Sequence, residues 1–262
     1  MPPPVAPWRS SFLSTLSKTK SSSFTLSTIT TNTATNTASP RSRTVEFRGF
    51  FPRPPSDLHH SAIDSLKAQN IGLNPDVYES DFLSLTTDVR MKKMGELKEG
   101  DEVEGVFWVE EASAQWRVKG RAVAVGEPSV HGREIGSEER QSRERIQRGL
   151  RVKSGREGEV QGWDWERAIA GYFANHTPVM RGTFKSPPPG RPRSEKPSDP
   201  ELKLGAKVED LNDPVARANF RVLVVCPEEV EVLDFSNPDD VRRTKWVFSE
   251  GEQSWTETEL WP

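Results

Sequence analysis

The sequence predicts a mainly β protein, a β-barrel with flanking helices, formed as a single domain over residues 1–262. Short segments that alternate apolar and polar residues outnumber helical patterns, and two of them, residues 102–111 and 115–125, form a long central pair. No GxGxxG follows an expected strand, and the sequence contains no GxxxxGK[ST]. These observations favour a barrel over a parallel α/β sheet, and they exclude nucleotide binding through the glycine-rich loop of a Rossmann fold or of a P-loop.

The composition narrows the class of partner. Hydrophobic residues make up 33% of the 262, so the core is modest for the chain length and loops are expected. The net charge of −3 gives no general attraction to nucleic acid or to an anionic membrane. No apolar run approaches the roughly 20 residues of a spanning helix. We therefore expect no nucleic-acid or membrane partner and a cytoplasmic location.

The N-terminal region supports two interpretations. Residues 1–56 hold seven basic side chains against one acid, and with their Ser and Thr content they resemble a mitochondrial transit peptide. However, Trp8, Phe12 and Leu16 are spaced as one helical face, and FTLSTITT alternates as a strand. We place this region in the fold and keep the mitochondrial location as the minority alternative.

The first third of the chain predicts a helix from Pro7 to about Ser17, then a hairpin of strands over 23–31 and 42–48. A proline-rich insertion follows over 49–80, with a helix at about 61–68. Adjacent His59 and His60 lack a third ligand at suitable spacing, so they are expected on the surface and no metal site is predicted.

Residues 81–99 change period part-way. Phe82 to Thr87 predicts a strand, and Val89 to Leu97 predicts a helix capped by Thr87 or Asp88. The first turn of that helix holds three basic residues, Arg90, Lys92 and Lys93. Cations oppose the helix dipole there, whereas free backbone N–H groups and cations together suit a phosphate. A phosphate pocket and a solvated helix face are equally compatible with the pattern.

The remainder predicts few regular elements. The charge-dense segment from about 128 to 160 is expected as an exposed helix or a partly disordered insertion, and 163–176 as a helix. FRVLVVCPEEVEVLDF predicts two strands kinked at Pro227, and a closing hairpin follows. Cys226, the single cysteine, is expected to be buried and structural. Trp108 and Trp116 are expected in a core or an interface.

The stretch PRSRTVEFRG, residues 40–49, combines strand propensity with Arg41, Arg43 and Arg48. It reads as a buried strand with an anionic partner, although arginines on an edge strand also act as solubilising gatekeepers.

Three segments in order, PRSRTVEFR, LTTDVRMKKMGEL and QWRVKGRA, resemble the flavin-binding split barrel of the pyridoxamine 5′-phosphate oxidase family. A PWR…L helix and an R-x-x-F-x-S-P-P-P-G loop are similar to the divergent branch of oxidase-like FMN-binding proteins. The likeness covers most of 7–48, 81–125, 163–190 and 219–262. It leaves insertions at about 49–80, 127–162 and 191–218.

The resemblance implies an FMN site shared by two copies of the chain. The strand that meets the flavin ring maps onto Arg43, Thr44, Val45, Glu46 and Arg48. The grip on the 5′-phosphate maps onto Thr86, Thr87, Lys92 and Lys93, with Arg90 nearby. Gln115 matches the glutamine offered by the second subunit, which implies a homodimer. Arg243 and Trp246 match the family's late flavin-contacting pair.

The chain also departs from the family. Phe184, Lys185 and Ser186 run into Pro187 where the oxidase has an arginine that holds the substrate phosphate, and DDVRRTKW lacks the family's histidine. A site without them would orient pyridoxamine phosphate poorly. We therefore expect an FMN-dependent oxidoreductase of unknown substrate, with no side chain assigned to catalysis. The alternatives are a genuine pyridoxamine 5′-phosphate oxidase and a cofactor-free split-barrel binding module.

Overall fold

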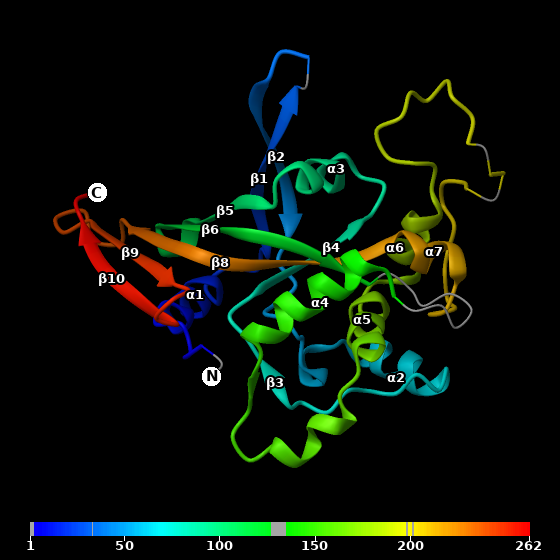
Figure 1. Ribbon diagram of the computed structural model, residues 1–262, viewed down its shortest axis with the longest axis horizontal. Helices are drawn as coiled ribbons and strands as arrows, with labels where there is room; N and C mark the ends of the chain where they lie inside the picture. The colour runs from blue at the N-terminus through cyan, green and yellow to red at the C-terminus, as the bar shows by residue number, and fades with distance from the viewer. Residues whose placement is uncertain (1–2, 33, 127–134, 198, 201) are drawn as a thin grey trace.

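A computed structural model describes residues 3–32, 34–126, 135–197, 199–200 and 202–262. An eight-stranded antiparallel sheet runs through the molecule, with helices packed against it (Figure 1). Its strands are β1 (Ser23–Asn32), β2 (Thr37–Glu46), β4 (Leu83–Asp88), β5 (Glu102–Val109), β6 (Ala114–Val125), β8 (Phe220–Asp234), β9 (Arg242–Ser249) and β10 (Ser254–Leu260). The path through the sheet is β10-β9-β8-β6-β5-β1-β2, and β4 pairs with β8.

The sheet closes on itself through the segment after β2. The Arg48 N–H donates to the Ser84 carbonyl at 2.8 Å, and the Ser84 N–H donates to the Gly49 carbonyl at 2.9 Å. A bridge from Phe50 to Leu83 extends this contact along β4. The ring of strands is therefore β1-β2-β4-β8-β6-β5 and back to β1. This confirms the predicted mainly β split barrel.

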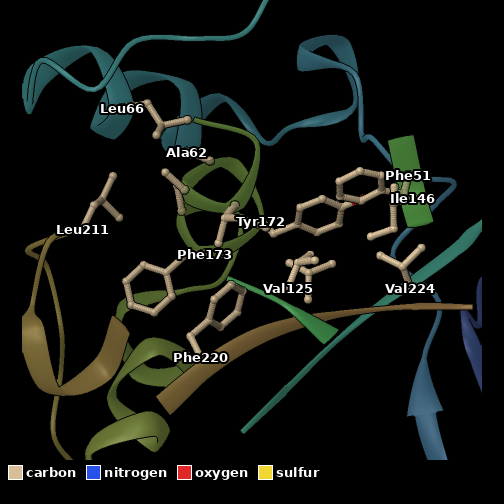
Figure 2. Close-up of a cluster of buried hydrophobic side chains, with 14 of the residues drawn as sticks. Phe51, Ala62, Leu66, Val125, Ile146, Tyr172, Phe173, Leu211, Phe220 and Val224 are labelled. Carbon is tan, nitrogen blue, oxygen red and sulfur yellow. The ribbon is translucent and has the colours of Figure 1, made fainter. Parts of the chain in front are cut away.

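Two apolar cores lie on the two sides of the barrel wall. Inside, Phe12 of helix α1 (Arg9–Leu16) and Trp8, the residue that precedes this helix, pack with inward residues such as Leu26 and Trp116. The N-terminal region thus belongs to the fold, as predicted. Outside, Tyr172 and Phe173 of α5 pack on the wall (Figure 2). The outer elements are α2 (His60–Ala68), α4 (Ser137–Gly149), α5 (Trp165–Ala174), α6 (Pro178–Gly182), α7 (Pro214–Asn219), β3 (Tyr78–Glu79) and β7 (Arg151–Val152).

Strand β8 corrects the prediction of two strands separated by Pro227. It is one strand of 15 residues, with Pro227 opposite Gly120 where the register with β6 shifts. A Cβ at Gly120 would lie 2.1 Å from the Cys226 carbonyl oxygen, so the proline fits only because glycine stands opposite. Cys226 is buried as predicted, and burial raises the pKa of its thiol to about 12.

Two further expectations were wrong in detail. The arginine-bearing strand β2 is mostly exposed rather than buried. The helix after β4, α3 (Lys92–Glu99), begins at Lys92 rather than Val89, and its N-cap is Met91 with no side-chain cap. The charge-dense segment contains α4, but residues 127–134 lie outside the described residues. Trp116 is buried, whereas Trp108 is 57% exposed.

Within the described ranges, no helix has the length and apolar character to cross a membrane. The same part of the chain contains no group of three or more His, Cys, Asp or Glu residues placed to hold a metal ion. His59 and His60 are both exposed, as predicted.

A buried carboxylate joins the N-terminal segment to the outer layer. Asp81 accepts from Arg9 at 2.7 Å, from both terminal nitrogens of Arg151 at 2.6 and 3.0 Å, and from the backbone N–H of Ala6 at 2.9 Å. Arg9 also donates to the Ser80 carbonyl. Asp81 thereby pairs with both guanidinium groups, and Arg151 has a second, more distant carboxylate partner in Glu79 at 3.4 Å.

We expect Asp81→Asn to lower the free energy of unfolding by about 3 kcal/mol, because it leaves two arginines facing a neutral amide in a desolvated site. Asp76→Asn is the matched control, since the Asp76–Lys153 pair is partly exposed and should contribute less than about 1 kcal/mol. Denaturant unfolding of both variants at neutral pH measures the difference. Equal losses of unfolding free energy in the two variants would show that the Asp81 cluster does not stabilise the contact between the N-terminal segment and the outer layer.

Candidate functional site

Arg43 meets a threonine and a glutamate in a closed triangle of hydrogen bonds. Its Nη2 lies 2.5 Å from Glu96 Oε2, and its Nη1 lies 2.5 Å from Thr28 Oγ1. The Thr28 hydroxyl in turn donates to Glu96 Oε2 at 2.6 Å. The three residues come from β2, β1 and α3, so the triangle ties the helix to the hairpin. Charged partners make such bonds roughly twice as strong as neutral ones.

Lys93 is the second cation at this position. It is 7% exposed, and burial is the main reason that its pKa falls below the ordinary lysine value, followed by repulsion from Arg43. Asp88 and Glu96 partly offset this effect. In the described part of the chain its ammonium donates to the thioether of Met91 at 3.3 Å, and no carboxylate pairs with it. A buried ammonium beside an arginine fits an anion such as a flavin 5′-phosphate.

The other two cations of this segment point elsewhere. Arg90 precedes the helix and binds Asp88 at 2.6 and 2.9 Å, and it donates to the carbonyls of Ser186 and Phe184. Lys92 is exposed and lies against Gly190 of the proline-rich loop. The observed helix start therefore separates Lys93, which faces Arg43, from Arg90 and Lys92, which face the loop over 184–190.

The ring-contacting residues implied for β2 lie along a free strand edge. Over 37–46, β2 pairs with β1 alone among the described strands, so its other edge presents backbone groups. Thr44 is exposed on it, and Val45 packs against the barrel interior. Glu46 accepts from Ser22 and Ser23, each at 2.5 Å, and these bonds lower the pKa of its carboxyl group.

Arg48 lies on the opposite side of the strand from Arg43. Its Nε is buried and has no hydrogen-bond partner among the described residues, and burial lowers its pKa. Its charge helps to depress the pKa of His176, which burial mainly lowers to about 4. His176 Nε2 lies 2.9 Å from Thr86 Oγ1. Thr87, by contrast, faces α3, with its hydroxyl 3.7 Å from Met91 Sδ.

A row across β6, β8 and β9 holds Gln115, which matches the second subunit's glutamine, and Arg243, which matches the late flavin-contacting arginine. Gln115 stands opposite Leu233, and Leu233 stands opposite Arg243, so Gln115 and Arg243 flank one position of the sheet. Arg243 pairs with Glu231 at 3.0 Å, while its buried Nε has no partner in the described residues. In one direction around the ring, β5 and β1 lie between this row and β2. In the other, β4 meets β8 only at residues 220–225, far along the strand from Leu233. Within one chain, therefore, the row and the Arg43–Lys93 pair belong to different parts of the sheet.

Trp246 lies in the barrel core rather than at an open site. Its ring stacks on Trp116 with centroids 6.0 Å apart, and its indole N–H donates to Glu257 at 2.7 Å. A separate groove of about 1390 Å³ lies between α4, β6, β8 and the β9–β10 hairpin, with charges of both signs on its walls. Its lining includes neither Arg43 nor Lys93, so the groove and the cation pair are distinct features.

The candidate site thus consists of a closed barrel in which buried Lys93 lies beside Arg43, next to the open edge of β2 among the described strands. Residues 5–126 match the family model of the pyridoxamine 5′-phosphate oxidase FMN-binding domain. Over residues 5–126 the chain is similar to this FMN-binding domain, and the match supports FMN as its cofactor. No curated protein matches the sequence.

Two solved structures share the fold over nearly the whole chain. One is a pyridoxamine 5′-phosphate oxidase-related, FMN binding protein from Nostoc punctiforme PCC 73102, with a TM-score of 0.59 and 17% identity, covering 99% of this chain and 100% of that chain. The other is PhzG from Burkholderia lata 383 in complex with tetrahydrophenazine-1-carboxylic acid, with a TM-score of 0.51 and 15% identity, covering 99% and 94%. At these identities the likeness shows the fold alone.

Sequence reasoning missed Glu96 and His176. Glu96 carries a signal, because it follows Lys93 by three residues and so shares its helix face. His176 has no local signal, because its partner Thr86 is 90 positions away. The two meet where the end of α5 lies beside β4, and the Tyr172 hydroxyl of α5 donates to Ser84 Oγ of β4 at 2.9 Å.

The depressed pKa of His176 predicts acid sensitivity. The unfolded chain takes up a proton near pH 6.5, whereas the folded histidine stays neutral down to about 4, so stability falls as the pH drops through this window. We expect wild type to lose about 2 kcal/mol more than His176→Gln between pH 7 and pH 5. His59→Gln, at an exposed site, is the control and should behave as wild type. If the free energy of unfolding falls by the same amount between pH 7 and pH 5 in all three proteins, His176 is not the source of the acid sensitivity.

Proposed function

We propose that two copies of the chain bind FMN between them and act as an FMN-dependent oxidoreductase. Arg43 and Lys93 hold the 5′-phosphate of the FMN. The observation that carries this proposal is the state of Lys93, a 7% exposed ammonium beside Arg43. Among the described residues it forms no ion pair, and Asp88 and Glu96 offset only part of the cost of its burial. Burial of an uncompensated charge is unfavourable unless a ligand completes the site. A phosphate dianion at this position would pair with both side chains.

The free edge of β2 supports the position of the flavin ring. The backbone groups of 43–46 that are not bonded to β1 lie on the other edge of the strand, where they are available to the polar edge of a ring laid along it. When bound, FMN supplies the electron-transfer chemistry, and the protein supplies position and shelter from water. Arg48, whose buried Nε has no hydrogen-bond partner within the part of the chain that the structure describes, would place positive charge on the other side of the strand. We assign no side chain as a general acid or base.

The outer face near Gln115 supports the homodimer. Trp108 stands opposite Gln115 in the β5–β6 ladder and is 57% exposed. Its ring meets the partly exposed ring of Phe235, with centroids 6.4 Å apart. Exposed aromatic residues and an arginine are typical of the centre of a protein–protein interface, and here they lie beside Gln115. A partner docked here would bring its β2 edge toward this row and complete the site.

The alternative of a genuine pyridoxamine 5′-phosphate oxidase has less support. The loop that would hold a substrate phosphate instead offers the carbonyls of Phe184 and Ser186 to Arg90. Lys185 in that loop pairs with Asp213 at 2.9 Å. The cofactor-free binding module is separated from our proposal by flavin binding itself. The cytoplasmic location stays a prediction from the sequence.

Lys93→Met tests the phosphate site. We expect this variant to bind FMN about 10- to 100-fold more weakly than wild type, the range that follows from losing one charged hydrogen bond of about 1.5–3 kcal/mol. Its affinity for riboflavin, which lacks the phosphate, should not change. Titration of flavin fluorescence on cofactor-free protein measures both affinities.

Lys92→Met is the control, because Lys92 is the preceding residue of the same helix and is exposed. It should bind both flavins as wild type does. Wild-type protein that binds flavin without preferring FMN over riboflavin would refute the phosphate site, and protein that binds neither flavin would make the cofactor-free module the better assignment.

A further inference from the structure

We propose that Glu96 is a built-in counter-ion of the phosphate site, which stabilises the cofactor-free protein and weakens its hold on FMN. The inference rests on the proposed function, because it concerns the same two cations. It adds a residue outside the predicted site and a direction for its effect on cofactor affinity.

The geometry places Glu96 against the cations. Glu96 is 9% exposed, and its Oε2 accepts hydrogen bonds from both Arg43 and Thr28. Glu96 and Lys93 are three residues apart on α3, hence on one helix face, and Glu96 helps to keep Lys93 charged. The carboxylate therefore acts on both cations, by contact with Arg43 and through space on Lys93.

The charges give the sign of the effect. Arg43 and Lys93 contribute two positive charges and Glu96 one negative charge, while Asp88 is already paired with Arg90. The cofactor-free site thus carries a net charge of +1. A phosphate dianion would bring it to −1 with glutamate present and to zero with glutamine at 96. Because the groups are largely buried, little solvent screens these charges.

The same carboxylate has the opposite effect on the empty protein. Without the Glu96 carboxylate, the repulsion between Arg43 and Lys93 would not be offset at this position. The neutral Thr28 hydroxyl would be the remaining partner of the Arg43 guanidinium in the triangle. Glu96 therefore takes the place of the phosphate before FMN arrives and repels the phosphate once it is bound. The expected result is a stable apoprotein and an exchangeable cofactor.

Glu96→Gln tests the proposal because it keeps the size of the side chain and removes its charge. We expect about 10-fold tighter binding of FMN, unchanged binding of riboflavin, and a lower unfolding midpoint of the cofactor-free protein. Fluorescence titration and thermal unfolding without flavin provide these readouts. Glu99→Gln is the control, since Glu99 is an exposed residue of the same helix that accepts from the Thr31 N–H at 3.2 Å.

A double variant keeps the test decisive if Glu96→Gln folds poorly. Combining it with Lys93→Met removes one charge of each sign, so the cofactor-free double variant should unfold at a higher temperature than Glu96→Gln alone. A merely structural role for Glu96 predicts no such rescue. Weaker or unchanged FMN binding by Glu96→Gln, or no rescue, would overturn the counter-ion role. Failure of the proposed function would instead appear as wild-type protein that does not distinguish FMN from riboflavin.

Discussion

The hydrogen bonds between residues 48–51 and β4 are the constraint on which the site depends. They close the ring of strands, and they bring the end of β2 beside the strand that leads into α3. Without this closure, the arginines of β2 and the lysines of α3 would have no reason to meet. The barrel interior then fixes the distance between them, because Phe47 and Phe50 on either side of the turn pack with Phe12 in the interior core.

Alternation along β2 and the extended segment that follows it places Arg43 and Arg48 in two different environments. Arg43 shares its side with Val45 and Leu26 and reaches Thr28 and Glu96. Arg48 faces the layer of α5, where it influences His176. Successive side chains of a strand point to opposite faces, so residues five apart in an extended chain cannot serve one anion in the same way. A single cationic stretch of sequence therefore supplies positive charge on two sides of the strand.

Buried charge in this protein is paired in two different ways. Asp81 is paired with Arg9 and Arg151, and Glu79 lies 3.4 Å from Arg151, so this cluster has two charges of each sign and is complete within the chain. The Arg43–Lys93–Glu96 group has one cation in excess, and that excess is what a ligand can complete. The contrast follows from the same rule, that a desolvated charge needs a partner. It separates a structural cluster from a binding cluster without reference to any relative.

The alternation of apolar residues determined the strands, the central β5–β6 pair and the buried Cys226, because these depend on local period and burial. The basic character of 41–48 and 90–93 was likewise plain in the sequence. Only the tertiary structure decided which cations meet. A helix start at Lys92 instead of Val89 turns Lys93 toward Arg43 and leaves Arg90 outside the helix. The contacts of Glu96 and His176 join segments 53 and 90 residues apart, and local patterns carry no information about such pairs.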